Sequence, residues 1–517
     1  MVKKEEEIKI PSSQSDDFPL CLIVEKKERG YQLMDTIVRD GEYNFKELEK
    51  EIYRLVCEAG TEITCQILEY KDQKIFEEVD KKKYKSQGFR TTTVKTQYGN
   101  VRYKRRVYLT RLEDGKKAYV YLLDKAIGMK TIGLISENLA EIIADTATEA
   151  PYRETADVVS NATGISISAQ GAWNVMQRIG ERINDEEACD VDRMNAEKCE
   201  GTKIIPVLFE EMDGVWIRQQ GEHHEKKPKQ EVKMATTYEG WDAGKEEQKR
   251  STLVGKHVIA GIESSRTFHE KREADIRKRY DADEIGQRIV NGDGGSWIGE
   301  PNDPDAVIQL DPFHMHKEIR RLIADKEAGK EIERRLASKD IEGMLSYIRM
   351  YADSVATDDR SDNRTKNALE LLKYLSNNKE SLIPWKERGI SIPEPPEGLL
   401  YKGMGVQENQ NCTIITMRMK HRRMRWSENG GNNMAKALAR KENKELHETI
   451  ERYSDTLIFG GEIIEAIKVL SAAKSPKKDG KGDRYADIWN GHMPVLDAVM
   501  TGARKIFRGI ASGEGVL

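Results

Sequence analysis

Two aspartates share one local pattern, a short apolar run before the carboxylate and glycine after it. They are Asp213 in "LFEEMDGVW" and Asp293 in "RIVNGDGGSW". β-Branched residues such as Ile289 and Val290 favour the end of a buried strand, and the glycines predict a turn. An open α/β sheet places its chemistry beyond such strand ends. Because Asp-Gly is also a common turn dipeptide, Asp293 alone would indicate no more than a plain turn.

The pair is more informative than either residue. Two carboxylates that converge at neighbouring strand ends repel each other unless a cation lies between them. Hard oxygen ligands of this kind suit Mg²⁺ or Mn²⁺, which also bind phosphate oxygens. Two such ions activate a water or a 3′-hydroxyl and stabilise the departing oxygen in phosphodiester transfer. Asp213 and Asp293 therefore predict metal-dependent DNA strand chemistry.

A third carboxylate usually completes such a site from a helix further along the chain. The best candidate is Glu428 in "RMRWSENGGNNMA", which follows a basic, aromatic segment and precedes a helix-forming run. We expect Asp213, Asp293 and Glu428 to be the catalytic residues and the metal ligands. Glu445 and Glu448 fit less well, because they lie in an ordinary charged helix. Glu210 and Glu211 are two further candidates. Because neighbouring strand residues point to opposite faces, one of the two must point away from the site.

The segment "LDPFHMHKEI" brings one aspartate close to two histidines. Asp311 and His314 share one face as a helix begins, and such a pair can bind a metal or hold an orientation. We expect His314 either to support the active-site strand or to contact phosphate. His316 is expected to be structural.

Two basic segments are interleaved with aromatic or methionine side chains, "YKRRVY" at 103–108 and "RMKHRRMRW" at 418–426. The formal net charge is −4, so the chain as a whole is not basic. Positive charge beside a stacking surface nevertheless suits a DNA backbone and its unpaired bases. A solvated surface is the alternative interpretation. In the second segment we expect DNA contacts from Arg422, Arg423, Arg425 and Trp426.

A helical pattern over residues 130–182 suggests a DNA-binding motif. One helix is expected from Tyr152 to about Ala162, with a stop at Gly164 and a second helix capped by Ser166 or Ser168. Two short helices joined by a glycine turn form a helix-turn-helix, whose second helix faces a DNA groove. A plain helical hairpin is the equal alternative. The groove-facing residues would be Gln170, Asn174, Gln177 and Arg178.

The 517 residues are too many for one compact core of ordinary size, and the element pattern predicts several regions. Residues 1–125 form an α+β region with a long helix and a hairpin whose turn is at Gly99-Asn100. The alternating order β-β-β-α-β and β-α after residue 200 fits an α/β, ribonuclease-H-like core. Before the core we expect the α+β region 1–125 and a helix-turn-helix region 126–200. The core is expected to begin at 201–316, to be interrupted by a mostly helical insertion at 317–410, and to be completed within 411–517, which also contains C-terminal helices.

Composition excludes several classes of protein. Charged residues make up 34%, and no apolar run approaches the length of a membrane span. The start "MVKKEEEIKI" lacks the apolar centre of a signal peptide, which predicts a cytoplasmic protein. The six cysteines form no CxxC pair, so neither a zinc ribbon nor a disulfide framework is expected.

The sequence resembles the ISLre-type insertion-sequence transposases of bacteria, within the wider Mutator-like group. The motifs that carry the resemblance have the same order and spacing over most of residues 90–440: "YRETADVVSNATGISISAQGAWN", "EEMDGVW", "NGDGGSWI", "LDPFHMHKEI" and "RWSENGGNNMA". The resemblance implies a ribonuclease-H-like fold with a helical insertion and a catalytic DDE set at Asp213, Asp293 and Glu428. It also matches Asp311 and His314 to a Cys/Asp-x-x-His motif of the group.

The leading hypothesis is a DDE transposase that cleaves DNA and transfers strands with Mg²⁺ or Mn²⁺. Its expected partners are the terminal repeats of an insertion sequence, target DNA and further copies of the chain in a homo-oligomer on DNA. It would act at the nucleoid of the bacterial cytoplasm, without a membrane. One alternative is a ribonuclease-H-like nuclease that only cleaves. Another is a non-catalytic helix-turn-helix DNA-binding protein derived from a transposase, which would not need three such carboxylates.

Overall fold

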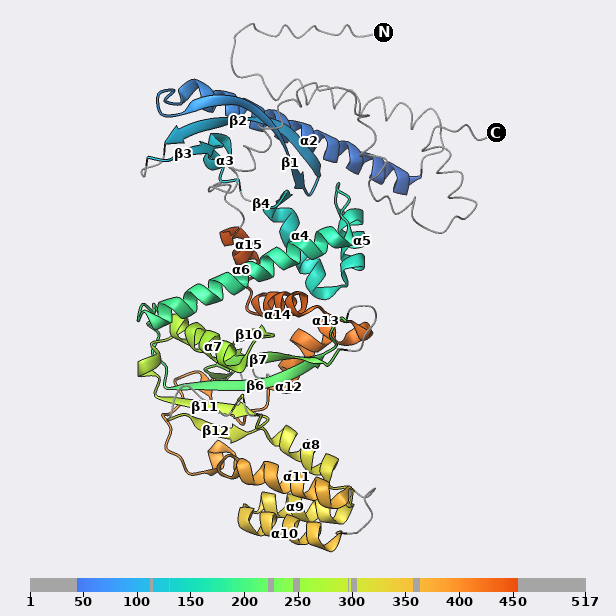
Figure 1. The fold of residues 1–517 in the computed structure, drawn as a ribbon, viewed down its shortest axis with the longest axis vertical. Helices are drawn as coiled ribbons and strands as arrows, with labels where there is room; N and C mark the ends of the chain where they lie inside the picture. Colours follow the sequence, from blue (N-terminus) through green and yellow to red (C-terminus); the bar gives the residue numbers. More distant parts are fainter. Residues whose placement is uncertain are drawn as a thin grey trace, which may run out of the picture. The chain divides into compact units, whose positions relative to one another are not determined.

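The computed structural model describes residues 44–111, 115–129, 131–221, 227–244, 252–295, 297–298, 305–356 and 363–453 (Figure 1). The chain divides into two compact units, one of Met1–Leu109 and Tyr121–Ile458, the other of Thr110–Val120 and Phe459–Leu517. The strand β3 (Lys117–Val120) belongs to the second unit. The last residues of β2 also belong to the second unit, and all the other described elements belong to the first unit. Among the described helices, none is both long enough and apolar enough to cross a membrane.

The N-terminal part is a long helix followed by a hairpin, as the sequence predicts. The helix α2 (Phe45–Glu78) is capped by Asn44. The antiparallel strands β1 (Lys85–Thr96) and β2 (Gly99–Arg111) follow, and their turn is Gln97-Tyr98, just before the expected Gly99-Asn100. β1 also pairs with β5. The remaining elements of this part are α3 (Leu122–Ala126), β4 (Thr131–Ile132) and β5 (Ile135–Ser136).

The basic segment 103–108 lies in β2, and most of it serves the interior of the protein. Both of its tyrosine rings are buried. Arg105 is buried and pairs with Asp124, while Arg106 pairs with Asp72 of α2 at 2.7 Å. The rings therefore cannot stack on bases and these two guanidinium groups are neutralised, so the expectation of a DNA-binding patch here was wrong.

Three helices follow, and their ends agree with the local capping signals. They are α4 (Glu137–Glu149), α5 (Tyr152–Ala162) and α6 (Ala169–Asn195). The Ser168 hydroxyl accepts a hydrogen bond from the Gly171 N–H at 3.0 Å, which caps α6 as expected. These helices share one apolar core with the central sheet and with α14 (Glu428–Glu442). Residues 126–200 are thus packed as part of a larger body.

The central sheet is mixed and has five strands. They are β6 (Val207–Ile217), β7 (Gln230–Tyr238), β10 (His257–Gly261), β11 (Gln287–Gly292) and β12 (Val307–Leu310). Their order across the sheet is β10-β7-β6-β11-β12. β7 runs antiparallel to β6 and β10, whereas β11 runs parallel to β6 and β12. The helix α7 (Ser265–Arg279) connects β10 to β11 along the chain.

The strand β6 corrects the expected position of Asp213. The sequence predicts a turn at Asp213-Gly214, but β6 continues through both residues and pairs with β7 along its length. The Glu231 side chain lies over this glycine, with its Oε1 2.0 Å from the position that a Cβ at Gly214 would take. Asp213 still lies beside the end of β11, since Met212 pairs with Gly292, the last residue of that strand.

A helical insertion follows β12 (Figure 1). Its helices are α8 (Pro312–Leu322), α9 (Lys326–Ala337), α10 (Ile341–Ser354) and α11 (Arg364–Asn377). They enclose an apolar core of their own, which includes Met344, Ile348 and Leu371. A small sheet adds strands from before and after the insertion: β8 (Gly240–Asp242), β9 (Leu253–Val254) and β13 (Leu399–Leu400).

After the insertion the chain returns to the central sheet as one helical segment. It consists of α12 (Gln407–Gln410), a π-helical turn (Asn411–Thr416) and α13 (Met417–Met419). This segment lies against β6. A π-helical turn is rare, and such turns are frequent at functional sites. The helices α14 and α15 (Leu446–Tyr453) complete the described part of the chain.

The residue His257, at the start of β10, ties α14 and its following loop to the sheet. Its Nε2 lies 3.1 Å from Glu445 Oε1, and its Nδ1 lies 3.1 Å from Asp275 Oδ2. Arg440 donates to the other Glu445 oxygen at 2.8 Å. Burial opposes ionisation, but His257 and Arg440 outweigh it and lower the pKa of Glu445 to about 2. Glu445 is therefore an ion-paired structural residue and not an ordinary exposed helical glutamate.

We expect Glu445→Gln to lower the free energy of unfolding at pH 7 by about 2 kcal/mol, because a pKa shift of one unit corresponds to about 1.4 kcal/mol and water partly screens these pairs. A carboxyl whose pKa falls on folding stabilises the protein above its ordinary value of 4.5, and this contribution disappears as the pH falls towards 2. Urea denaturation should therefore show the difference shrinking at acid pH. Glu448→Gln, on an exposed side chain, should cost less than about 0.5 kcal/mol. Equal losses in both variants would refute this assignment.

Candidate metal centre

The structure brings Asp213 and Asp293 to one cavity of about 430 Å³. The Gly214 N–H donates to Asp213 Oδ1 at 2.7 Å, and the Gly295 N–H donates to Asp293 Oδ1 at 2.7 Å. Tyr374 of α11 donates from its hydroxyl to the carbonyl oxygen of Asp293 at 2.8 Å. Neighbouring backbone thus orients both carboxylates, and the insertion holds the loop after β11.

An oriented imidazole lies on the same cavity. Asp311 is the N-cap residue of α8, and its Oδ2 lies 2.8 Å from His314 Nδ1. The opposite ring atom, His314 Nε2, lies 3.6 Å from Asp213 Oδ2. Asp311 therefore holds the ring with Nε2 towards the Asp213 carboxylate. His316 points elsewhere and pairs with Glu333 of α9 at 3.2 Å.

Two further carboxylates line this cavity, Glu318 of α8 and Glu408 of α12. Glu318 accepts hydrogen bonds from Arg321, whereas Glu408 faces Asp213 and His314. Ligand atoms of Asp213, His314 and Glu408 lie within 4.8 Å of one another. Asn411, on the adjoining π-helical turn, donates from Nδ2 to Asp213 Oδ2 at 2.5 Å. Sequence reasoning missed Glu408, although it expected an acid on a helix after the insertion. The available signal was the polar run "QENQN" at the return from the insertion.

Burial and the neighbouring charges have opposing effects on the pKa values of Asp213 and His314. Burial raises the pKa of Asp213 to about 6; His314 and the Gly214 N–H oppose the rise, while Asp293 and Glu408 add to it. Burial also disfavours the charged form of His314, but Asp311, Asp213 and Asp293 outweigh it and raise its pKa. The site thus gathers more negative charge than its imidazole neutralises.

The residues present fit a divalent cation. Clustered carboxylate oxygens with one imidazole nitrogen form a donor set for a hard ion such as Mg²⁺ or Mn²⁺. Burial raises the pKa of Asp213, and a cation beside this carboxylate would favour its charged form. Lys317 and Lys420 also line the cavity, so phosphate groups would meet positive charge at its wall.

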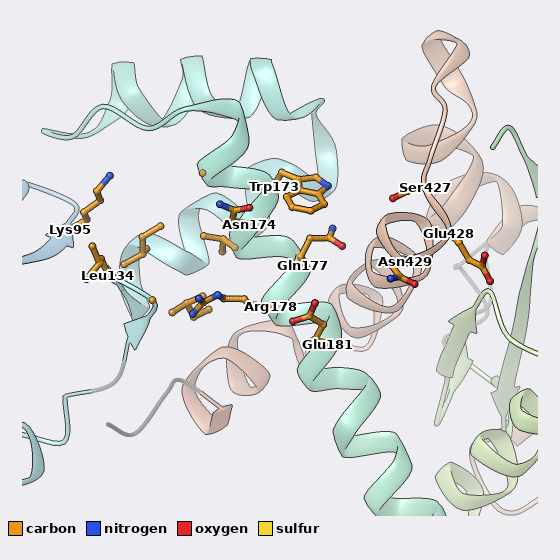
Figure 2. Close-up of a pocket in the computed structure, with 15 residues that line it drawn as sticks. Lys95, Leu134, Trp173, Asn174, Gln177, Arg178, Glu181, Ser427, Glu428 and Asn429 are labelled. Atoms are coloured by element: carbon orange, nitrogen blue, oxygen red, sulfur yellow. The ribbon is translucent and has the colours of Figure 1, made fainter. Parts of the chain in front are cut away.

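The structure does not bring Glu428 to this site. Glu428 opens α14, directly after Trp426, which bridges to Gln219 beyond the end of β6. At about 3.3 Å per residue, Gln219 lies about 20 Å along the strand direction from Asp213. Glu428 instead lines a separate cavity of about 960 Å³ with Trp173 and residues of α6 (Figure 2). As an exposed acid in the first turn, it suits the positive end of the helix dipole.

The two glutamates beside Asp213 are buried and hydrogen-bonded or ion-paired. Glu210 accepts a hydrogen bond from Arg288 Nε at 2.7 Å and lies 3.2 Å from Arg272. Glu211 points to the other face of the sheet, where it contacts Tyr238 and the chain before Glu408. The alternation of faces expected from the strand pattern is confirmed.

The predicted groove-facing residues of α6 separate into two environments. Gln170, Asn174 and Arg178 are exposed. Gln177 is buried, and its Oε1 accepts a hydrogen bond from Asn433 Nδ2 of α14 at 2.9 Å. The expectation that Gln177 contacts DNA was therefore wrong. The two helices approach closely at Gly180, where a Cβ would lie 2.2 Å from Asn433 Cβ.

The second basic segment, residues 418–426, also contains both exposed and buried side chains. Arg423 and Arg425 are exposed, and the exposed Arg422 pairs with Glu154 at 2.6 Å. Trp426 is buried, and its Nε1 donates to the Met419 carbonyl oxygen at 2.9 Å. The indole ring packs in the main apolar core and offers no stacking surface, so the expected role of Trp426 in binding DNA was wrong.

Three comparisons with known proteins gave matches. A family model described as "Uncharacterised protein family (UPF0236)" matches residues 38–453. The Streptococcus gallolyticus "UPF0236 protein in vanSb 3'region" is 26% identical over 416 residues, 77% of this chain and 83% of that protein. Among solved structures, the Drosophila P element transposase strand transfer complex matches 65% of this chain and 86% of that chain, with 12% identity and a TM-score of 0.20.

Proposed function

The chain belongs to the UPF0236 family, and we propose that it is a DDE transposase of the ISLre type, which cleaves the ends of an insertion sequence and transfers strands. The main support for this proposal is that Asp213, Asp293 and Glu408, together with His314, line one cavity at the central sheet. These groups come from distant segments of the chain. A structural hydrogen-bond network does not need so many acids around a cavity.

The topology of the sheet supports a ribonuclease-H-like core. The first three strands of this sheet, β6, β7 and β10, pair antiparallel in chain order, with β8 and β9 of the small sheet between the second and the third. Two later strands add in parallel on the side of the first. A helix precedes the fourth strand, which is the β-β-β-α-β order expected from the sequence. The helical insertion after the fifth strand agrees with the resemblance to the Mutator-like group.

We propose Glu408 as the third acid, in place of Glu428. Asp213, Asp293 and Glu408 would hold Mg²⁺ or Mn²⁺, with His314 beside them. When bound, the ions activate a water or a 3′-hydroxyl and stabilise the departing oxygen. Asp311 orients His314, and Asn411 holds one oxygen of Asp213. Lys317 and Lys420 would attract the phosphate backbone at the cavity wall.

For DNA binding we propose the exposed residues of α6 and of the second basic segment. These are Gln170, Asn174, Arg178, Arg422, Arg423 and Arg425. The ligands would be the terminal repeats and target DNA, bound by a homo-oligomer at the nucleoid in the bacterial cytoplasm. Recognition by base-edge contacts from α6 gives specificity, and the arginines position the phosphates.

Two variants of α6 separate recognition from packing. Asn174→Ala is expected to weaken binding to the terminal repeats about tenfold without changing thermal stability, since one base-edge contact is worth about 1–3 kcal/mol. Gln177→Ala removes the side-chain hydrogen bond from buried Asn433, which keeps only its weaker contacts with the Gln177 carbonyl and Asn184, and should lower the free energy of unfolding by about 1 kcal/mol, with DNA affinity retained. Fluorescence anisotropy and thermal denaturation measure both quantities. The reverse pattern would exclude α6 as the recognition helix.

The proposed activity is tested with the purified protein, labelled terminal repeats of its own element and Mg²⁺. A transposase yields nicks or breaks at the repeat ends and, with precleaved 3′-hydroxyl donors, joined strand-transfer products. Cleavage without joining supports the nuclease alternative instead. Specific binding with no cleavage in Mg²⁺ or Mn²⁺ supports the non-catalytic alternative.

A further inference from the structure

The carboxylate of Glu211 is fully buried and accepts hydrogen bonds from three neighbouring segments. On the sheet, the Tyr238 hydroxyl donates to Oε1 at 2.6 Å, and Asn291 Nδ2 donates to Oε2 at 3.2 Å. From the chain after the insertion, the Gly405 N–H lies 3.0 Å from both oxygens, and the Gln407 N–H donates to Oε2 at 3.2 Å. All of these partners are donors, so the site requires an acceptor on both oxygens.

The segment that Glu211 holds leads directly into the candidate metal centre. Gln407 is adjacent to Glu408, and its side-chain Nε2 donates to Asn411 Oδ1 at 3.1 Å. This bond turns the Asn411 amide so that its Nδ2 donates to Asp213 Oδ2 at 2.5 Å. One set of hydrogen bonds thus runs from Glu211 through the backbone of α12 to the Asp213 carboxylate.

The backbone at Gly405 is shaped for this contact. Its φ of 131° lies in a region that L side chains rarely adopt. A Cβ there would meet no atom within 4 Å, so the requirement for glycine is conformational and not steric. This turn directs the Gly405 N–H towards Glu211, which anchors the start of α12 on the sheet.

From these contacts we propose that Glu211 is a positioning residue, which fixes α12 so that Glu408 and Asn411 meet Asp213. The inference rests on the proposed function, because it gives Glu211 a purpose in assembling the metal site. Its charge matters as well as its shape. A glutamine would place an amide N–H₂ against at least one N–H donor and would leave a buried group unpaired. Glu210 offers a matched control, since it is equally buried on the same strand and contacts Arg272 and Arg288 instead.

The test compares Glu211→Gln with Glu210→Gln in the full chain. Amide hydrogen exchange over residues 403–419 should become at least about tenfold faster in Glu211→Gln, measured relative to the amides of the central strands. In Glu210→Gln this relative rate should not change. Titration with Mn²⁺ should show an affinity about 10- to 100-fold weaker for Glu211→Gln, the usual effect of losing an outer-shell partner. The end-cleavage rate should fall while affinity for the repeats is retained.

Several outcomes would overturn the inference. Unchanged exchange over 403–419 together with wild-type Mn²⁺ affinity in Glu211→Gln would do so, as would equal changes in Glu210→Gln. If Glu211→Gln does not fold, Tyr238→Phe removes one donor but keeps the ring and the carboxylate, and it should show a smaller change of the same kind; no change in it overturns the proposal. If the wild-type protein does not cleave DNA, the proposed function fails, while exchange and Mn²⁺ affinity still decide the role of Glu211.

Discussion

Asp213→Asn and Asp293→Asn are each expected to reduce DNA cleavage by about 1,000-fold or more, since loss of one group that stabilises developing charge costs at least about 100- to 1,000-fold. The amide keeps the shape of the side chain but loses the charge that holds the cation. Both variants should still fold and bind the repeats, because neither residue contributes to an apolar core. Labelled terminal repeats measure cleavage, and anisotropy measures binding in the same preparations.

The stability of these variants provides an internal check. Burial and two nearby carboxylates raise the pKa of Asp213 to about 6, so its charge costs stability at neutral pH relative to the unfolded chain. In Asp213→Asn this cost is removed, but the new amide group faces the Gly214 or Asn411 donor. Added Mg²⁺ should nevertheless stabilise the wild type more than the variant. Cleavage at the wild-type rate by either variant would remove these aspartates from the active site.

Glu408→Gln is expected to lose cleavage to a similar extent, about 1,000-fold, while Glu428→Gln retains it within a factor of about two. The reason is position, because Glu408 shares a cavity with Asp213 and Asp293, whereas Glu428 lines another beside α6. Both are glutamates near the start of a helix after the insertion, so the pair is well matched. If Glu408→Gln cleaves at the wild-type rate and Glu428→Gln does not, the third acid is Glu428 of α14 and not Glu408.

The aspartates and the helix ends could be predicted because their signals are local. An apolar run before Asp293 marks a strand end, and Ser168 caps α6 through its own hydroxyl. Asp213 lies beside the end of β11, as expected, but it does not lie in a turn. The Asp-Gly pair resembles a turn, yet pairing with β7 keeps the strand extended. Only the structure shows that Gly214 lies within the strand, beneath the Glu231 side chain.

The third acid could not be predicted because its position depends on packing between distant segments. Glu408 is polar, lies among polar residues and is brought beside Asp213 by the packing of α12 and the π-helical turn against β6, where Glu211 and Asp213 both accept hydrogen bonds from this segment. Gln177 and Trp426 failed as predicted DNA contacts for the same reason. Each has a residue type that suits DNA, but each is buried by a tertiary contact, with Asn433 and with Met419 respectively.

An anomalous difference map of crystals soaked in Mn²⁺ tests most directly whether this cavity binds a metal ion. We predict a peak in the cavity of Asp213 and Glu408, with carboxylate oxygens of both within about 2.0–2.3 Å, and Asp293 facing the same ion or a second one. The peak should be absent from Asp213→Asn crystals soaked in the same way. A peak at Glu428, or wild-type crystals with Mn²⁺ bound elsewhere and none at Asp213, would contradict the assignment of this cavity as the metal centre.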